Sequence, residues 1–129
     1  MVQPRDLVEA ARLFNTNFYF EAHDALEELW ASERGADKRF LQALVHLAVG
    51  MVHISNENHR GAVNLLTRAT AGLEGFAPSH LGLDVAGLID RARVCLFKSE
   101  EALSGIPPAW VAEDRPTMAW GGEPPGSAG

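Results

Sequence analysis

The chain has 129 residues, 47% of them hydrophobic and 22% charged, which are ordinary values for one globular domain. Its net charge is −6, and residues 1–34 carry seven acids against three arginines. A nucleic-acid-binding protein needs a basic face that neutralises phosphates, and no stretch of this chain supplies one. The lone cysteine, Cys95, excludes an internal disulfide and a cysteine-rich zinc site. We therefore expect a cytoplasmic protein with no nucleic-acid partner.

No membrane partner is expected either. The first residues are polar, which predicts no signal peptide. The longest apolar run, residues 44–54, is interrupted by two histidines and a glycine. It is far shorter than the roughly 20 apolar residues that span a bilayer. This run is typical of a buried core helix.

Five segments have helical periodicity, and three of them lie in the first half of the chain. The first starts at Pro4 and ends near residue 14, and the second covers about 20–34 with Gly35 as its stop. The third opens with Asp37 as its N-cap and continues to about residue 56. Because it is apolar nearly all round, we expect it to be the central helix.

The fourth segment starts after Asn58, and the fifth, with Asp84 as its N-cap, ends near residue 105. No segment shows the alternation of a strand, so the predicted fold class is all-α: a compact array of about five helices, made of two antiparallel helical hairpins and a C-terminal helix. The helical domain is predicted at 1–105, followed by a proline- and glycine-rich tail at 106–129. Trp110 lies in this tail, so we expect part of the tail, but not its last eight residues, to pack on the body.

An internal repeat with an offset of 40 residues supports the hairpins: residues 12–22 align with residues 52–62. Each copy reads as the end of one helix, a short polar turn and the start of the next helix. The arrangement is similar to tetratricopeptide-type hairpins, although a peptide-binding groove needs more than two copies. The alternative, that any antiparallel helix pair needs such a turn, stays open.

The most distinctive polar residues lie in the second and third segments. On a helix, His23, Glu27 and Trp30 fall within about 60° of one another. The third segment carries a matching polar stripe, which consists of Gln42, His46, Gly50 and His53. If the turn between the second and third segments centres near residues 35–36, the polar residues of the two segments lie at the same level along the two antiparallel helices. Helix rotation then decides whether they face each other and form a buried polar site.

Three interpretations of this cluster stay open. In the first, the cluster is a structural hydrogen-bond network. In the second, it binds a small molecule or acts as an acid–base pair. In the third, it holds a divalent metal ion through His23, Glu27 and His46. The corresponding functions are a binding or scaffold role and, as an alternative, a metal-assisted hydrolase or other small-molecule enzyme that uses His23 and Glu27. A third hypothesis is an oligomeric protein-interaction module, with a homo-oligomer served by the acidic first hairpin and the tail tryptophans.

The residues that carry a family resemblance are Phe14-Asn15, the run 19–30, the run 41–48, and Asn58 with Gly61-Ala62. Together they resemble the small helical prokaryotic proteins grouped as domain of unknown function 309. That family's motif reads Phe-Asn, then Phe-x-x-His-Glu-x-Leu-Glu-x-x-Trp, then Leu-Gln-x-Leu-x-Gln-x-Ala. By position, the resemblance singles out Asn15, His23, Asp24, Glu27, Trp30, Gln42 and Gly61.

This sequence departs from the family's pattern at two positions. Asp24 stands where the family usually has glutamate, and His46 stands where glutamine is common. The second departure weakens a metal-ligand role for His46. The resemblance implies an all-α fold, and it supplies no activity, substrate or cofactor.

If the cluster is buried, we expect Glu27→Ala to lower the free energy of unfolding by a few kcal/mol, because it leaves a buried histidine without its partner. Chemical denaturation measures this change. A loss below about 0.5 kcal/mol would count against burial.

Overall fold

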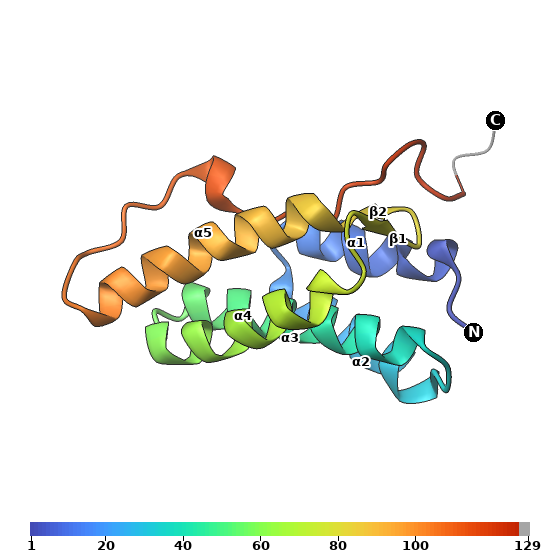
Figure 1. The fold of residues 1–129 in the computed structure, drawn as a ribbon, viewed down its shortest axis with the longest axis horizontal. Coiled ribbons are helices and arrows are strands. Elements are labelled where there is room, and N and C mark those ends of the chain that lie inside the picture. Colours follow the sequence, from blue (N-terminus) through green and yellow to red (C-terminus); the bar gives the residue numbers. More distant parts are fainter. Residues whose placement is uncertain (127–129) are drawn as a thin grey trace.

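Helices make up most of the structure, a computed structural model that describes residues 1–126. A short 3-10 helix, η1 (Pro4–Leu7), leads into α1 (Val8–Asn15), followed by α2 (Tyr19–Ser32), α3 (Asp37–Ser55), α4 (His59–Glu74) and α5 (Val85–Leu103). A second 3-10 helix, η2 (Ala112–Asp114), lies in the C-terminal segment. Figure 1 shows these elements as an array in which α5 lies along α4. The predicted all-α class is confirmed.

A short β-hairpin between α4 and α5, with two residues in each strand, departs from the prediction that the chain has no strand. β1 (Ser79–His80) pairs antiparallel with β2 (Leu83–Asp84). Leu81 and Gly82 make the turn with φ angles of +50° and +83°. Strands this short cannot show an alternating pattern, so sequence periodicity does not detect them.

The two predicted N-caps have different outcomes. The Asp84 carboxylate accepts a hydrogen bond from the Gly87 backbone N–H at 3.0 Å, so it caps α5 as predicted. Asp37 does not cap α3, because Ala36 occupies that position without a side-chain bond. The Asp37 Oδ1 atom lies 2.6 Å from His80 Nε2 instead. This contact ties the start of α3 to β1, which a local sequence pattern cannot indicate.

The internal repeat of the sequence corresponds to a repeated turn. The Phe18 N–H donates to the Leu13 carbonyl at 2.8 Å, and the Asn58 N–H donates to the His53 carbonyl at 2.8 Å, each position shifted by 40 residues. These bonds close the ends of α1 and α3 in the manner of Schellman motifs. The chain therefore contains two helical hairpins, α1–α2 and α3–α4, and the turn inside each hairpin has the same hydrogen-bond pattern.

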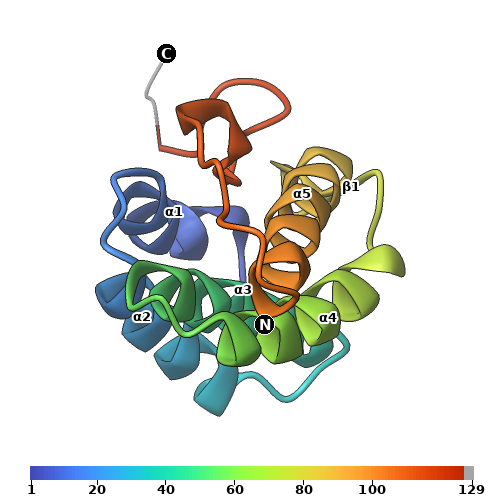
Figure 2. The same ribbon diagram turned by 90° about the vertical axis from the view of Figure 1, so that its left-hand side faces the viewer.

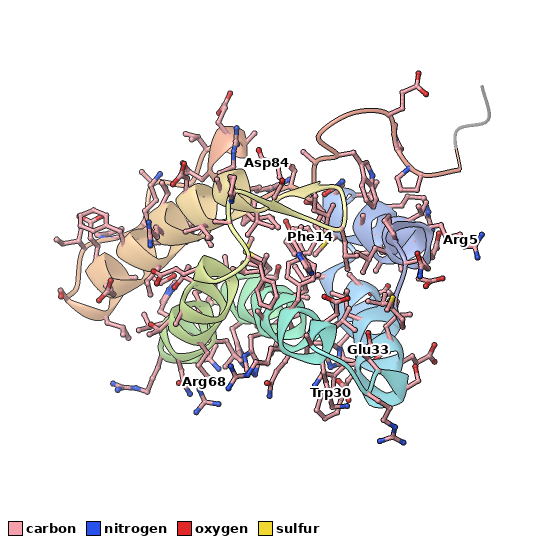
Figure 3. The ribbon with its side chains drawn as sticks, turned by 45° about the vertical axis from the view of Figure 1, so that its right-hand side comes forward. Arg5, Phe14, Trp30, Glu33, Arg68 and Asp84 are labelled. Carbon is pink, nitrogen blue, oxygen red and sulfur yellow. The ribbon has the colours of Figure 1, made fainter. Side chains whose placement is uncertain are left out.

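Each helix packs mainly on its neighbour in the chain, with α3 between α2 and α4. The largest fully buried side chains include Phe14, Leu26, Phe40 and Leu47. Figure 3 shows Phe14 inside the helical array. Figure 2 shows that the segment after α5 runs back between α1 and α5. Within residues 1–126, no helix has the length and apolar character needed to cross a membrane.

Small residues bring α3 and α4 close together. A Cβ atom added at Gly50 would lie 2.8 Å from Leu66 Cδ2, and one added at Gly72 would lie 2.9 Å from the Ala43 Cβ. Contacts this short leave no room for a larger side chain at either glycine. Gly50 belongs to the polar stripe of α3 that also contains Gln42 and His46. Because Gly50 packs on Leu66 of α4, this stripe lies on the side of α3 that faces α4 and not α2.

Glu57 provides a test of the repeated turn, because it adopts a left-handed backbone conformation with φ of +58°. For a non-glycine residue this conformation costs roughly 1–2 kcal/mol. We expect Glu57→Gly to raise the free energy of unfolding by about 1 kcal/mol, measured by chemical denaturation. The matched control is Glu57→Ala, which removes the carboxylate but keeps the backbone cost and should change stability by less than about 0.5 kcal/mol. A stability loss in the glycine variant would contradict this account of the turn.

Candidate functional site

The predicted polar residues of α2 form an exposed cluster. His23 Nε2 lies 2.6 Å from Glu27 Oε2, and His23 Nδ1 lies 3.4 Å from Asp24 Oδ1. The side-chain exposure is 20% for His23, 52% for Glu27 and 62% for Asp24. The structure therefore brings these three residues together, but at the surface of the molecule and not in the buried site that the matched stripes suggested.

The predicted residues of α3 lie elsewhere. Gln42 and His46 line a groove between α3 and α4 to which α2 contributes no residue. The predicted metal set of His23, Glu27 and His46 is therefore not assembled. Within residues 1–126, no group of three or more His, Cys, Asp or Glu side chains is placed to hold a metal ion. The physical reason is the close contact of α3 and α4, which fixes the rotation of α3.

Trp30 belongs to a third place, the connection from α2 to α3. Lys38 Nζ lies 4.2 Å from the centroid of the Trp30 ring and donates to the Trp30 backbone carbonyl at 2.6 Å. It also donates to the Glu33 carbonyl at 3.2 Å. A lysine in this position satisfies carbonyls that the last turn of a helix leaves unpaired. The contacts of Trp30 thus stabilise the connection between α2 and α3.

Asn15, at the end of α1, binds the C-terminal segment. Its Nδ2 atom donates to the Met118 carbonyl at 3.1 Å, and the Met118 N–H donates to Asn15 Oδ1 at 2.7 Å. The Met118 side chain is fully buried. Nearby, the Asp84 N–H donates to the Ala119 carbonyl at 2.8 Å. The chain around residue 118 is thus held on the body by its backbone.

Lys98 of α5 holds an earlier part of the same segment. Its Nζ atom donates to the Ala109 carbonyl at 2.7 Å and pairs with the Asp114 carboxylate. The hydrogen bond from Lys98 is the main reason that the pKa of Asp114 is lowered. Residues 109–121 therefore attach to the body at both ends.

A cavity of about 610 Å³ lies beneath this segment, and we call it the tail cavity. Its floor includes Asn17 and Glu57 of the repeated turns, with Tyr19 of α2 and His59 of α4. Cys95 of α5 and residues 108, 110–112, 114 and 115 of the C-terminal segment complete the wall. A cavity of this size suits a small organic molecule.

Besides the Glu57 carboxylate, two side-chain groups of the tail cavity have no hydrogen-bond or ion-pair partner among residues 1–126. His59 Nδ1 is buried and forms no hydrogen bond. The Arg115 guanidinium lines the cavity and forms neither a hydrogen bond nor an ion pair with these residues. A buried polar atom left unpaired costs about 1–3 kcal/mol, so His59 Nδ1 favours a bound molecule that supplies a hydrogen-bond partner. The Arg115 side chain is exposed, and its unpaired charge favours an anionic group.

The Tyr19 hydroxyl and the Cys95 thiol of the tail cavity are held in their protonated forms. Burial raises the pKa of the Tyr19 hydroxyl, with a smaller opposing effect of Arg115, and the hydroxyl donates to Asn17 Oδ1 at 2.9 Å. Burial raises the pKa of the Cys95 thiol to about 12, and its Sγ atom donates to the Asp114 carbonyl at 3.3 Å. Because the thiolate is the reactive form of cysteine, this arrangement suits binding rather than nucleophilic attack.

Sequence reasoning missed the tail cavity. Its wall combines residues from both repeated turns with residues of the C-terminal segment, which are distant from both turns in the sequence. Trp110 was the one available signal, since a large aromatic residue in a proline- and glycine-rich segment indicates contact with a body. The place of that contact could not be derived from periodicity.

Comparison with known proteins finds a family model that matches part of this chain. Residues 7–65 match the model of the family described as domain of unknown function (DUF309). The match confirms, over these residues, the family resemblance predicted from the sequence. A protein of Bacillus subtilis (strain 168), named uncharacterized protein YpuF, is 35% identical in an alignment of 78 residues that covers 58% of this chain. The alignment covers 45% of that relative's own length, so the chain spans less than half of it.

Neither the family's description nor the relative's name states an activity. The matched segment 7–65 contains both repeated turns and hence the floor of the tail cavity. Helix α5 and the C-terminal segment, which complete the cavity, lie beyond it.

The exposure of Glu27 changes the expected effect of Glu27→Ala. An exposed ion pair contributes about 0–1 kcal/mol, so we now expect a loss of less than about 1 kcal/mol in chemical denaturation. A loss of several kcal/mol would contradict the exposed position of the pair.

We expect Asn15→Ala to loosen the C-terminal segment, because it removes both hydrogen bonds to the Met118 backbone. Amide hydrogen exchange at Met118 should accelerate at least about ten-fold, the equivalent of about 1.4 kcal/mol. Thiol labelling of Cys95 should accelerate as well, because the thiol lies beneath this segment. Asn64→Ala, at an exposed position of α4, is the control. Equal exchange rates in the two variants would show that Asn15 does not hold the segment.

Proposed function

We propose that this protein binds a small organic acid in the tail cavity, with the apolar part of the ligand against the helices and its carboxylate on Arg115. The observation that carries the proposal is that the buried His59 Nδ1 atom and the exposed Arg115 guanidinium, both unpaired within residues 1–126, line one cavity. A binding role agrees with the hypothesis drawn from the sequence, although the site differs from the one expected there.

The apolar part of the ligand is supported by the cavity wall. Met51 and Ile54 of α3 and Trp110 of the C-terminal segment all line it. Aromatic and aliphatic walls with a few polar groups are typical of small-molecule sites. A flat or branched hydrocarbon group would bury surface against all three side chains.

The acidic head of the ligand is supported by Arg115. A guanidinium holds a carboxylate through two parallel N–H donors, and this guanidinium has no carboxylate partner among residues 1–126. Asp114, the adjacent acid, is engaged by Lys98. His59 Nδ1 offers a further polar contact inside the cavity.

The C-terminal segment would act as a cover whose docking is coupled to binding. Residues 108–115 supply much of the cavity wall, so a ligand that contacts them stabilises the docked arrangement. The expected cytoplasmic location belongs to this proposal, because the buried thiol of Cys95 needs no oxidising compartment.

The test compares 3-phenylpropionate with 3-phenylpropanol, which has a similar shape but no charge, by NMR titration of the full chain. We expect saturable shifts of the Trp110 indole and of Ile54 with the acid, and binding at least about ten-fold weaker with the alcohol. Arg115→Gln should weaken binding of the acid by about 10–100-fold and leave binding of the alcohol unchanged. Arg5→Gln, an exposed arginine of η1, is the control and should have no effect.

Two results would contradict the proposal. One is equal binding of the acid and the alcohol, which would exclude recognition of the carboxylate. The other is a set of shifts that spares Trp110, which would place the ligand outside the tail cavity.

A further inference from the structure

A second recess lies between α3 and α4, and none of its lining residues belongs to the C-terminal segment. We call it the α3–α4 groove. Its volume is about 630 Å³. Arg39, Gln42 and His46 line it from α3, and Arg68 lines it from α4. It therefore contains two residues of the polar cluster predicted from the sequence, in surroundings that the sequence did not indicate.

The charged side chains of the α3–α4 groove are basic, and no carboxylate lines it. Neither the Arg39 guanidinium nor the Arg68 guanidinium forms a hydrogen bond or an ion pair with any residue between 1 and 126. Figure 3 shows Arg68 at the outer surface of α4. On a chain with a net charge of −6, two unpaired arginines beside one recess create a local positive field. Such a field favours a bound anion.

The three polar residues of α3 lie on one face of the helix. Gln42 follows Arg39 by three positions and precedes His46 by four, the spacing at which helical side chains are neighbours. Arg68 acts on this row from the other helix: burial lowers the pKa of His46, and the nearby Arg68 charge lowers it further. The residues of the two helices thus converge on one place, and His46 is neutral there near pH 7.

The floor and one end of the groove are apolar. Gly72 lies so close to Ala43 that an added Cβ would be 2.9 Å from the Ala43 Cβ, which leaves a shallow floor between the arginines. Phe76 lines the end of the groove. Its ring is held by Phe40, with centroids 5.1 Å apart, and by His80, with centroids 4.8 Å apart. A fixed ring edge suits an apolar or aromatic substituent.

We propose that the α3–α4 groove binds a small phosphate monoester. Arg39 and Arg68 hold the phosphate dianion from two sides, the Gln42 amide donates to it, and the His46 ring forms one further hydrogen bond. The organic group of the ester lies toward Phe76. Two guanidinium groups offer more donors than the two oxygens of a carboxylate accept, so the phosphate is the better match.

An NMR titration of the full chain tests this proposal with phenyl phosphate, inorganic phosphate and benzoate. We expect phenyl phosphate to cause a saturable shift of the His46 ring protons with a Kd below about 1 mM. Inorganic phosphate should bind more weakly, because it has no group for Phe76. Benzoate should bind at least ten-fold more weakly than phenyl phosphate.

Three variants locate the site. Arg39→Gln and Arg68→Gln should each weaken phenyl phosphate binding at least ten-fold, and both should fold normally, because both side chains are exposed. Arg60→Gln removes an exposed arginine of α4 outside the groove and should leave the Kd unchanged. The His46 reporter is separate from the Trp110 reporter of the tail cavity, so either proposal can fail alone.

The proposal is overturned if benzoate binds as tightly as phenyl phosphate, since the groove would then not select phosphate. It is also overturned if Arg60→Gln weakens binding as much as the groove variants, which would indicate general attraction of anions. The proposal is likewise overturned if the His46 ring protons do not shift at phenyl phosphate concentrations up to about 10 mM, because the groove would then not bind the ester.

Discussion

The close contact between α3 and α4 is the constraint on which both candidate sites depend. Gly50 and Gly72 admit neighbouring side chains where a β-carbon would collide, so the two helices meet along one defined line. That line fixes the rotation of α3 about its axis. It places Gln42 and His46 beside Arg68 in the α3–α4 groove. It also leaves the His23–Glu27 pair of α2 at the surface, without a partner from α3.

The C-terminal segment is the second element that shapes the molecule. It fills the space between α1 and α5 that the helices leave open (Figure 2). Asn15 holds its backbone at residue 118, and Lys98 holds it at residues 109 and 114. The cavity beneath it has an aliphatic and aromatic wall and contains one buried polar atom, His59 Nδ1, that has no hydrogen-bond partner among residues 1–126. Under the proposed function, a ligand in the tail cavity would stabilise the docked arrangement of this segment.

The helices were predictable because their signals are local. The periodicity and terminal residues of each segment placed every α-helix within a few residues of its observed bounds, and the cap at Asp84 needed only its own turn. The repeat was visible for the same reason, since both turns use equivalent hydrogen bonds. The motif around His23 was sufficient to indicate the family that matches residues 7–65.

The candidate sites could not be predicted because they depend on contacts between distant residues. The sequence indicates that the polar residues of α2 and α3 lie at the same level along their helix axes. Whether their side chains point toward each other depends on the rotation of each helix about its axis. For α3, the contact of Gly50 with Leu66 of α4 determines that rotation. The Asp37 carboxylate contacts His80, which lies 43 positions later in the chain, and does not cap its own helix. The place where Met118 docks depends likewise on Asn15, at the far end of the chain.

The most direct test of the central claim is a NOESY spectrum of the full chain, because it reports which faces of α3 and α4 touch. The account predicts cross-peaks between the Gly50 α-protons and a Leu66 methyl group, and between the Gly72 α-protons and the Ala43 methyl group. It predicts none between the rings of His46 and His23. Cross-peaks between those two rings, with none at the glycines, would contradict the rotation of α3 and both sites built on it.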